Sequence, residues 1–172
     1  SNTGQNFTAG ANVAMIFMLA VEQDIDELDF AVKVFQDAMM RVRYSNIPVV
    51  IAPHNLTLGG GCEMSMHADK VVAHAELYMG LVEFGVGLIP GGGGSKEFAK
   101  RLSEELKAGD IKTNRLRQRF LTIGQAQVSK SAYEAFDLGY LREGIDEVVV
   151  SRDLQLTRAK QACLELADAG YI

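Results

Sequence analysis

The sequence predicts an α/β fold in a single domain, and two observations support this. β-Branched and aromatic residues are concentrated in three short stretches near the middle of the chain, which is typical of strands. Apolar residues recur at helical spacing before and after these stretches. The chain has 172 residues, enough to enclose one hydrophobic core but too few for two comfortable ones.

Two helices are expected at the start of the chain. Residues 14–21 are apolar and uncharged, so we expect a buried helix there. Residues 25–45 place apolar side chains at positions i, i+3, i+4 and i+7 from Leu28 to Val42, which forms one helical face. Acidic residues near its start suit the positive end of a helix dipole, and Pro48 follows its end.

Three strands and four further helices are expected in the rest of the chain. The strands are expected at 48–58, 70–75 and 76–81. The helices are expected at 95–106, 114–127, 129–141 and 153–171, and Gly109 is a stop signal after the first of them. Strands that feed helices, followed by a mostly helical C-terminal half, indicate an α/β or α+β protein.

Charge and composition exclude several functional classes. The net charge of −5 argues against a nucleic-acid surface, which needs a basic stripe. No apolar run approaches the roughly 20 residues of a membrane span. Cys62 and Cys163 fit no zinc or redox motif, so we expect two reduced thiols in a cytoplasmic protein. His54, His67 and His74 lack metal-ligand spacing, so we expect packing or surface positions and no metal site.

The glycine-rich stretch 85–97 does not fit a nucleotide-binding loop. A P-loop requires Gly-Lys-Ser/Thr, and this chain has Ser95 and Lys96 in the reverse order. A dinucleotide fingerprint requires a third glycine where Pro90 stands. Both nucleotide hypotheses therefore fail.

A second glycine-rich stretch, LGGGCEM at 58–64, places three glycines directly before a predicted helix. Backbone N–H groups at a helix N-terminus have no partner within the helix and carry partial positive charge. Because glycine has no Cβ, a ligand oxygen can approach these N–H groups closely. The alternative is a tight strand-to-helix turn with a packing glycine, and this motif alone leaves both interpretations open.

Two glutamates lie near these glycines. Glu63 falls in the first helical turn, where a solvated acid favoured by the helix dipole is the simpler interpretation. Glu83 is the only charged residue in YMGLVEFGVGLIP, and a carboxyl group among apolar residues tends to have a raised pKa and to act as a general acid or base. The alternative for Glu83 is a strand end that points into water.

Together these motifs resemble the crotonase superfamily, and within it the enoyl-CoA hydratases. The resemblance is carried by FTAGAN at 7–12, LGGGCEM at 58–64 and MGLVEFGVGLIPGGGG at 79–94, in that order. It implies a crotonase-like ββα spiral core that is truncated at its N-terminus and has a helical C-terminal half. The family's first strands and first helix should precede FTAGAN, and its usual C-terminal helices are shortened here.

The resemblance also implies the site residues. The N–H groups of Ala11 and Gly60 would form an oxyanion hole for a thioester carbonyl, and Glu63 and Glu83 would be the catalytic acids. Many relatives lack one or both acids, so the presence of both favours a hydratase. The residues expected to bind the CoA substrate are Ala9, Gly10, Ala11, Asn12, Val13 and Gly60, with Asn12 in place of the commoner aspartate.

A longer resemblance runs almost end to end, to the C-terminal half of bacterial multifunctional 3-hydroxyacyl-CoA dehydrogenases. It is carried by NFTAGANV, YMGLVEFGVGLIPGGGGSKE, VSKSAYEA and AKQACLELADAGY, and by a Lys- and Arg-rich insert after the GGGG run. In that class an NAD-binding part precedes a crotonase part. Residues 1–172, which begin at Ser1 without a methionine, are therefore expected to be a partial enoyl-CoA hydratase domain cut from a larger protein.

The implied reaction is the addition of water to a trans-2-enoyl-CoA, which gives a 3-hydroxyacyl-CoA. The CoA thioester is the expected substrate; this part needs no metal or redox cofactor, and NAD would bind the missing part. We also expect a homo-oligomer that contacts the missing N-terminal part. Two alternatives stay open: an isomerase that uses a single acid, and a non-catalytic assembly module that is inactive as a fragment.

Overall fold

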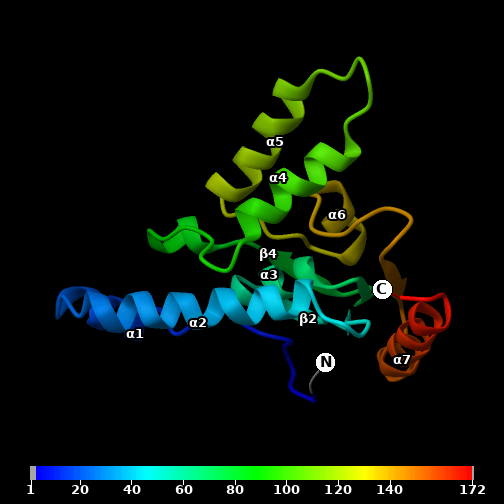
Figure 1. Ribbon diagram of the computed structural model, residues 1–172, viewed down its shortest axis with the longest axis horizontal. Helices are drawn as coiled ribbons and strands as arrows, with labels where there is room; N and C mark the ends of the chain where they lie inside the picture. Colours follow the sequence, from blue (N-terminus) through cyan, green and yellow to red (C-terminus); the bar gives the residue numbers. More distant parts are fainter. Residues whose placement is uncertain (1–2, 172) are drawn as a thin grey trace.

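The computed structural model describes residues 3–171, and its helices and strands follow the order of an α/β protein (Figure 1). Residues 1–2 and 172 lie outside the described part of the chain. The expected domain boundaries and the expectation about the start at Ser1 therefore lie outside it as well.

Two strand–strand–helix units form the centre of the fold. β1 (Val50–Ile51) and β2 (Asn55–Leu58) precede α3 (Gly60–His67), and β3 (Lys70–His74) and β4 (Leu77–Gly80) precede α4 (Gly94–Glu105). β1 pairs in parallel with β3, and β2 pairs in parallel with β4. The two strands of each unit therefore lie in different sheets, and this repeat is the ββα spiral predicted from the sequence.

The stretch 48–58 forms two strands, so the prediction of one continuous strand was wrong. Pro53 has no N–H to donate to a strand ladder. Asn55 has a φ of 47°, which is outside the extended region. The chain therefore leaves one sheet after Ile51 and enters the other at Asn55.

Helices pack around these sheets. α2 (Ile25–Arg43) contacts α3, α4 (Gly94–Glu105) contacts both α3 and α5 (Lys112–Gly124), α6 (Ala132–Asp137) contacts β4, and α7 (Arg152–Asp168) contacts β1, β3 and β5. All five lie within a few residues of the predicted helices, and α4 and α5 project together as an arm (Figure 1). β5 (Glu147–Val149) was not expected from the sequence; it is short and extends the sheet by pairing in parallel with β3.

The main hydrophobic core lies between α3, β3, β4, α4 and the segment around α6. Its buried side chains include Met66, Val71, Met79, Phe98 and Tyr140. The Phe98 and Tyr140 rings pack with their centroids 5.3 Å apart. α3 is thus surrounded by the core, and six of its eight residues are buried.

α1 (Val13–Val21) is helical as predicted, but the expectation that it is buried was wrong. None of its residues is buried, and Phe17, Met18 and Val21 are 66%, 59% and 64% exposed. The helix packs against α2, and the two extend away from the sheets (Figure 1). An apolar, uncharged helix is buried only where other parts of the fold pack against it. Among residues 3–171, α2 is the main element that packs against α1.

Candidate active site

The three glycines at the start of α3 meet two requirements, one of backbone conformation and one of space. Gly59 has a φ of +53°, which side chains with a Cβ rarely adopt. A methyl group on Gly60 would lie 2.7 Å from Cζ of Phe35, and one on Gly61 would lie 1.6 Å from Cγ2 of Thr8. The packing interpretation of this motif therefore holds, and it leaves the N–H of Gly60 to be considered separately.

The FTAGAN segment lies directly beside this turn. The N–H of Thr8 donates to the Leu56 carbonyl at 2.9 Å, and the N–H of Leu58 donates to the Thr8 carbonyl at 3.0 Å. This pairing places Gly10, with a φ of +99°, against the glycine turn. A methyl group on Gly59 would lie only 3.7 Å from Cα of Gly10. Two motifs that are far apart in sequence therefore meet in the fold.

The two N–H groups expected to bind a carbonyl follow these two glycines. Gly60 is the first residue of α3, so its N–H has no acceptor within the helix. Ala11 follows Gly10 and is exposed, as are Ala9 and Asn12.

Asn12 and Val13 belong to the start of α1. Val13 is its first residue, and Asn12 is its N-cap, with Oδ1 accepting a hydrogen bond from the N–H of Met15 at 3.3 Å. Asparagine and aspartate serve equally well as N-caps. The residue that departs from the commoner aspartate therefore still caps the helix.

Glu63 is buried, so the interpretation as a solvated acid was wrong. Its side chain is 1% exposed. The N–H of Gly92 donates to Oε1 and Oε2 at 2.9 and 3.0 Å, and the N–H of Gly94 donates to Oε1 at 2.8 Å. Burial raises the pKa of this carboxyl group, and the two N–H donors oppose the rise because they stabilise the ionised form.

The donors to Glu63 were missed in the sequence, although the GGGG run at 91–94 was visible. A methyl group on Gly92 would lie 2.6 Å from Oε2 of Glu63 and 2.4 Å from Cε1 of Phe35. Gly92 must therefore lack a side chain for the carboxylate to be held. Phe35, predicted only as part of an apolar helical face, covers both Gly60 and Gly92.

Glu83 begins η1 (Glu83–Val86), a short 3₁₀ helix that follows β4, and its carboxyl group points to the glycine turn. A methyl group on Gly59 would lie 3.3 Å from its Oε1. Its Oε2 is buried without a hydrogen-bond partner among the described residues, so the alternative that it points into water was wrong. Burial, with a smaller contribution from the charge of Glu63, raises the pKa of Glu83 to about 7.

The two carboxyl groups therefore lie near one another in different environments. Backbone N–H groups stabilise the ionised form of Glu63, whereas Glu83 has a buried oxygen to which no group of residues 3–171 donates. Pairs of titratable groups whose environments separate their pKa values are suited to act as one base and one acid.

The remaining sequence expectations concern histidines and cysteines. His54 and His67 are buried and His74 is half-buried, consistent with packing roles. Cys62 and Cys163 are both free thiols. Among residues 3–171, no group of three or more possible metal ligands gathers, and no helix is long and apolar enough to cross a membrane.

With this geometry in place, comparison with known proteins identifies the family. The sequence profile described as enoyl-CoA hydratase/isomerase matches residues 2–113. The chain belongs to this family. The expected crotonase resemblance is thereby confirmed.

Relatives of this family member include longer proteins. A probable 3-hydroxyacyl-CoA dehydrogenase of Bacillus subtilis is 45% identical over 170 residues, which are 99% of this chain and 21% of that protein. A putative fatty acid oxidation complex trifunctional enzyme of Rickettsia felis is 38% identical over 98 residues, which are 57% of this chain and 14% of that protein. The chain therefore spans only a small part of the length of these relatives.

Solved structures share the fold. An enoyl-CoA hydratase from Bacillus halodurans superposes with a TM-score of 0.73 at 16% identity, over 96% of this chain and 59% of that one. An enoyl-CoA hydratase from Bacillus anthracis superposes with a TM-score of 0.64 at 27% identity, over 83% of this chain and 48% of that one. The α/β spiral predicted from the sequence is thus the fold of this family.

Proposed function

We propose that this chain forms the enoyl-CoA hydratase site of a multifunctional β-oxidation protein and adds water to a trans-2-enoyl-CoA. The observation that carries the proposal is the pair Glu63 and Glu83 beside the same glycine turn, with Glu63 buried and one carboxyl oxygen of Glu83 buried. Family membership and the names of the longer relatives support it.

The environments of the two acids suggest their roles. Glu63, held ionised by the N–H groups of Gly92 and Gly94, takes a proton from water as the general base. The hydroxyl oxygen then bonds to the β-carbon of the enoyl group, and the electron pair of the double bond moves towards the carbonyl. Glu83, with a pKa of about 7, is the acid that gives a proton to the α-carbon.

The enolate oxygen formed in this step needs hydrogen-bond donors. In this proposal the N–H groups of Ala11 and Gly60 supply them, and residues 9–13 line the path of the CoA ester. Losing one such donor typically costs about 3–4 kcal/mol of transition-state stabilisation. Gly10 and Gly59, which lie side by side in the fold, allow the chain segments that carry these donors to approach each other closely.

The proposal assigns no metal or redox cofactor to this chain. In this proposal NAD would bind elsewhere in the complete protein, in keeping with the Bacillus subtilis relative, which is named as a probable 3-hydroxyacyl-CoA dehydrogenase. Assembly into a homo-oligomer, contact with the remainder of the polypeptide and a cytoplasmic location stay predictions.

The test is turnover by the complete protein with crotonyl-CoA, followed by the loss of absorbance of the conjugated enoyl thioester. Hydration is expected, and the product should be 3-hydroxybutyryl-CoA. Conversion of a cis-3-enoyl-CoA without hydration of crotonyl-CoA would favour the isomerase alternative. Absence of both reactions would favour the non-catalytic alternative.

A further inference from the structure

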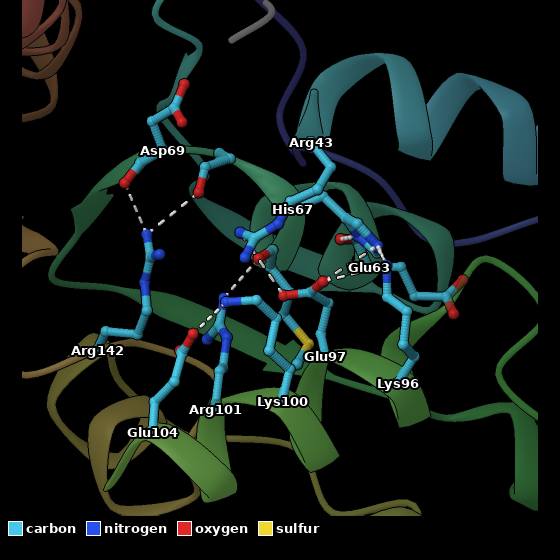
Figure 2. A network of polar contacts seen from close by, with 12 residues as sticks. Arg43, Glu63, His67, Asp69, Lys96, Glu97, Lys100, Arg101, Glu104 and Arg142 are labelled. Carbon is cyan, nitrogen blue, oxygen red and sulfur yellow. Dashed lines mark hydrogen bonds and ion pairs between the residues drawn. The ribbon is translucent and has the colours of Figure 1, made fainter. Parts of the chain in front are cut away.

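Behind the Glu63 carboxylate lies a charged cluster that the proposed reaction does not use; its imidazole and carboxylate are buried, and its lysine is 47% exposed. His67 is near the end of α3, Lys96 and Glu97 are in the first turn of α4, and Arg43 is the last residue of α2 (Figure 2). The side chains of His67 and Glu97 are 0% and 1% exposed. Three helices therefore meet at one imidazole ring and one carboxylate.

The His67 ring contacts both parts of the chain that fix Glu63. Its Nδ1 lies 2.7 Å from the main-chain carbonyl oxygen of Glu63. A methyl group on Gly93 would lie 3.2 Å from Nε2 and 3.3 Å from Cε1, so the ring lies directly beneath Gly93. Gly92 and Gly94, on either side of Gly93, hold the Glu63 carboxylate. One ring thus supports the main chain of Glu63 and the turn that binds its side chain.

One tautomer satisfies both hydrogen-bonding contacts of the ring. A carbonyl oxygen only accepts, so Nδ1 must carry a proton and donate it to Glu63. The ammonium group of Lys96 only donates and lies 3.1 Å from Nε2, so Nε2 accepts. This tautomer is neutral, and burial of the ring favours it over an imidazolium whose Nε2 would face Oε1 of Glu97 at 3.6 Å. Burial lowers the pKa of His67, the charge of Glu97 opposes this, and the charges of Lys96 and Arg43 lower it further.

Glu97 lies between the cations and the ring. Its carboxylate lies 3.2 Å from Nζ of Lys96, 3.6 Å from Nε2 of His67 and 3.8 Å from a guanidinium nitrogen of Arg43. One carboxylate thus faces two cations, and Lys96 can direct an N–H towards the imidazole. The cluster resembles the outer-shell hydrogen bonding that fixes a histidine tautomer in other sites.

We propose that His67 is a positioning residue for Glu63: its neutral ring, oriented by Lys96 and Glu97, holds the Glu63 main chain and the Gly92–Gly94 turn in register. This inference rests on the proposed function, in which Glu63 is the base. The ring does not touch the substrate. Its effect is to keep the two N–H donors aligned with the carboxylate, which keeps Glu63 ionised and correctly placed.

The test compares His67→Leu with His67→Asn in the complete protein. Leucine fills the space without a donor, whereas the amide of asparagine can replace the Nδ1–H donor to the Glu63 carbonyl. We expect His67→Leu to lower kcat for crotonyl-CoA by about 10- to 100-fold with little change in KM, the scale of a misplaced catalytic group. His67→Asn should restore most of that loss.

A second readout does not depend on turnover. The amide resonances of Gly92 and Gly94 should titrate with Glu63, and in His67→Leu this titration should move to higher pH because weaker N–H donation no longer lowers the Glu63 pKa. Cys62 and Glu83 interact with the charge of Glu63, and Arg43, Lys96 and Glu97 lie in the cluster behind it. None of these five residues is substituted in the two variants.

The matched control is Gln155→Leu. Gln155 is also fully buried and donates to the Pro53 and Val72 carbonyls, but it lies on α7. The Gln155→Leu variant should lose stability and keep the wild-type kcat. The proposal would be overturned if His67→Leu kept the wild-type kcat and the wild-type titration of the Gly92 and Gly94 amides. It would also be overturned if His67→Leu and His67→Asn lost equal amounts of kcat and these losses matched their losses of stability. If the wild-type protein hydrates nothing, the proposed function fails, while the titration shift still decides whether His67 positions Glu63.

Discussion

α1 and α3 are helices of similar length that each follow a glycine-containing motif, yet their surroundings are opposite. α1 contains only apolar residues, and none of them is buried. α3 contains Glu63, Ser65 and His67, and all three are buried. The more polar helix is therefore in the core, and the apolar one is on the surface.

The difference teaches that burial follows the partners that the fold supplies. Each polar side chain of α3 has one: Ser65 donates to the Gly61 carbonyl at 2.8 Å, His67 bonds to the Glu63 carbonyl, and Glu63 accepts from Gly92 and Gly94. A buried polar group with partners is tolerated, and one without them is costly. Substitutions around α3 should accordingly have large effects, and those in α1 should have small ones.

The largest effect is expected at the two acids. Glu63→Gln and Glu83→Gln should each lower crotonyl-CoA hydration in the complete protein by at least about 100-fold, the usual scale for a positioned acid or base. CoA-ester binding should change little. Glu165→Gln on α7, whose carboxylate is paired with Arg158 away from the site, is the matched control. Near wild-type hydration in either variant would remove that residue from the mechanism.

Gly60→Val should lower activity far more than it lowers stability. The N–H of residue 60 remains, but a side chain there obstructs or misaligns the carbonyl. The structure adds a complication, because a Cβ at Gly60 would collide with Phe35. The double variant Gly60→Val with Phe35→Ala relieves that collision, so it should recover stability without recovering turnover.

A spectroscopic measurement completes the Gly60 test. A conjugated enoyl-CoA analogue should show a red-shifted absorbance when its carbonyl is polarised in the wild-type site, and Gly60→Val should lose this shift. A folded Gly60→Val protein with normal turnover and a normal spectral shift would contradict the oxyanion-hole assignment.

Glu83→Gln should raise thermal stability, and the gain should depend on pH. The folded-state pKa of about 7 is above the ordinary value of 4.5, so the folded wild-type protein binds the proton more tightly than the unfolded chain does. The contribution of the Glu83 carboxyl group to the free energy of unfolding is therefore fully present below pH 4.5, and it is lost as the pH rises through about 7. The Tm difference between variant and wild type should therefore be larger at about pH 8 than at about pH 5; equal differences would contradict this.

The smallest effect on folding is expected in α1. Phe17→Ser combined with Met18→Ser should change the unfolding free energy by no more than about 0.5 kcal/mol per site, as for other surface positions.

The 172-residue chain should self-associate through such exposed apolar surface, and the Phe17→Ser, Met18→Ser variant should weaken the association measured by sedimentation velocity. Leu154→Ser combined with Leu156→Ser, an exposed pair on α7, is the control. A wild-type chain that stays monomeric at micromolar concentrations would contradict the prediction.

Much of this protein follows from the sequence alone. The periodicity of 25–45 predicted α2, because side chains three and four residues apart share a helical face whatever surrounds them. The run of glycines before a helix and the charge of Glu83 among apolar residues indicated a site, because both are visible within a few residues of the chain. The order of the three motifs indicated the family, which the comparisons confirm.

Only the tertiary structure decided which groups meet. The donors to Glu63 lie 29 and 31 residues along the chain, the Phe35 ring comes from another helix, and β5 forms because β3 offers it an unpaired edge. The same is true of the burial of α3 and the exposure of α1. Periodicity and backbone sterics act over a few residues, whereas hydrogen-bond partners and burial are supplied by segments that are distant in sequence.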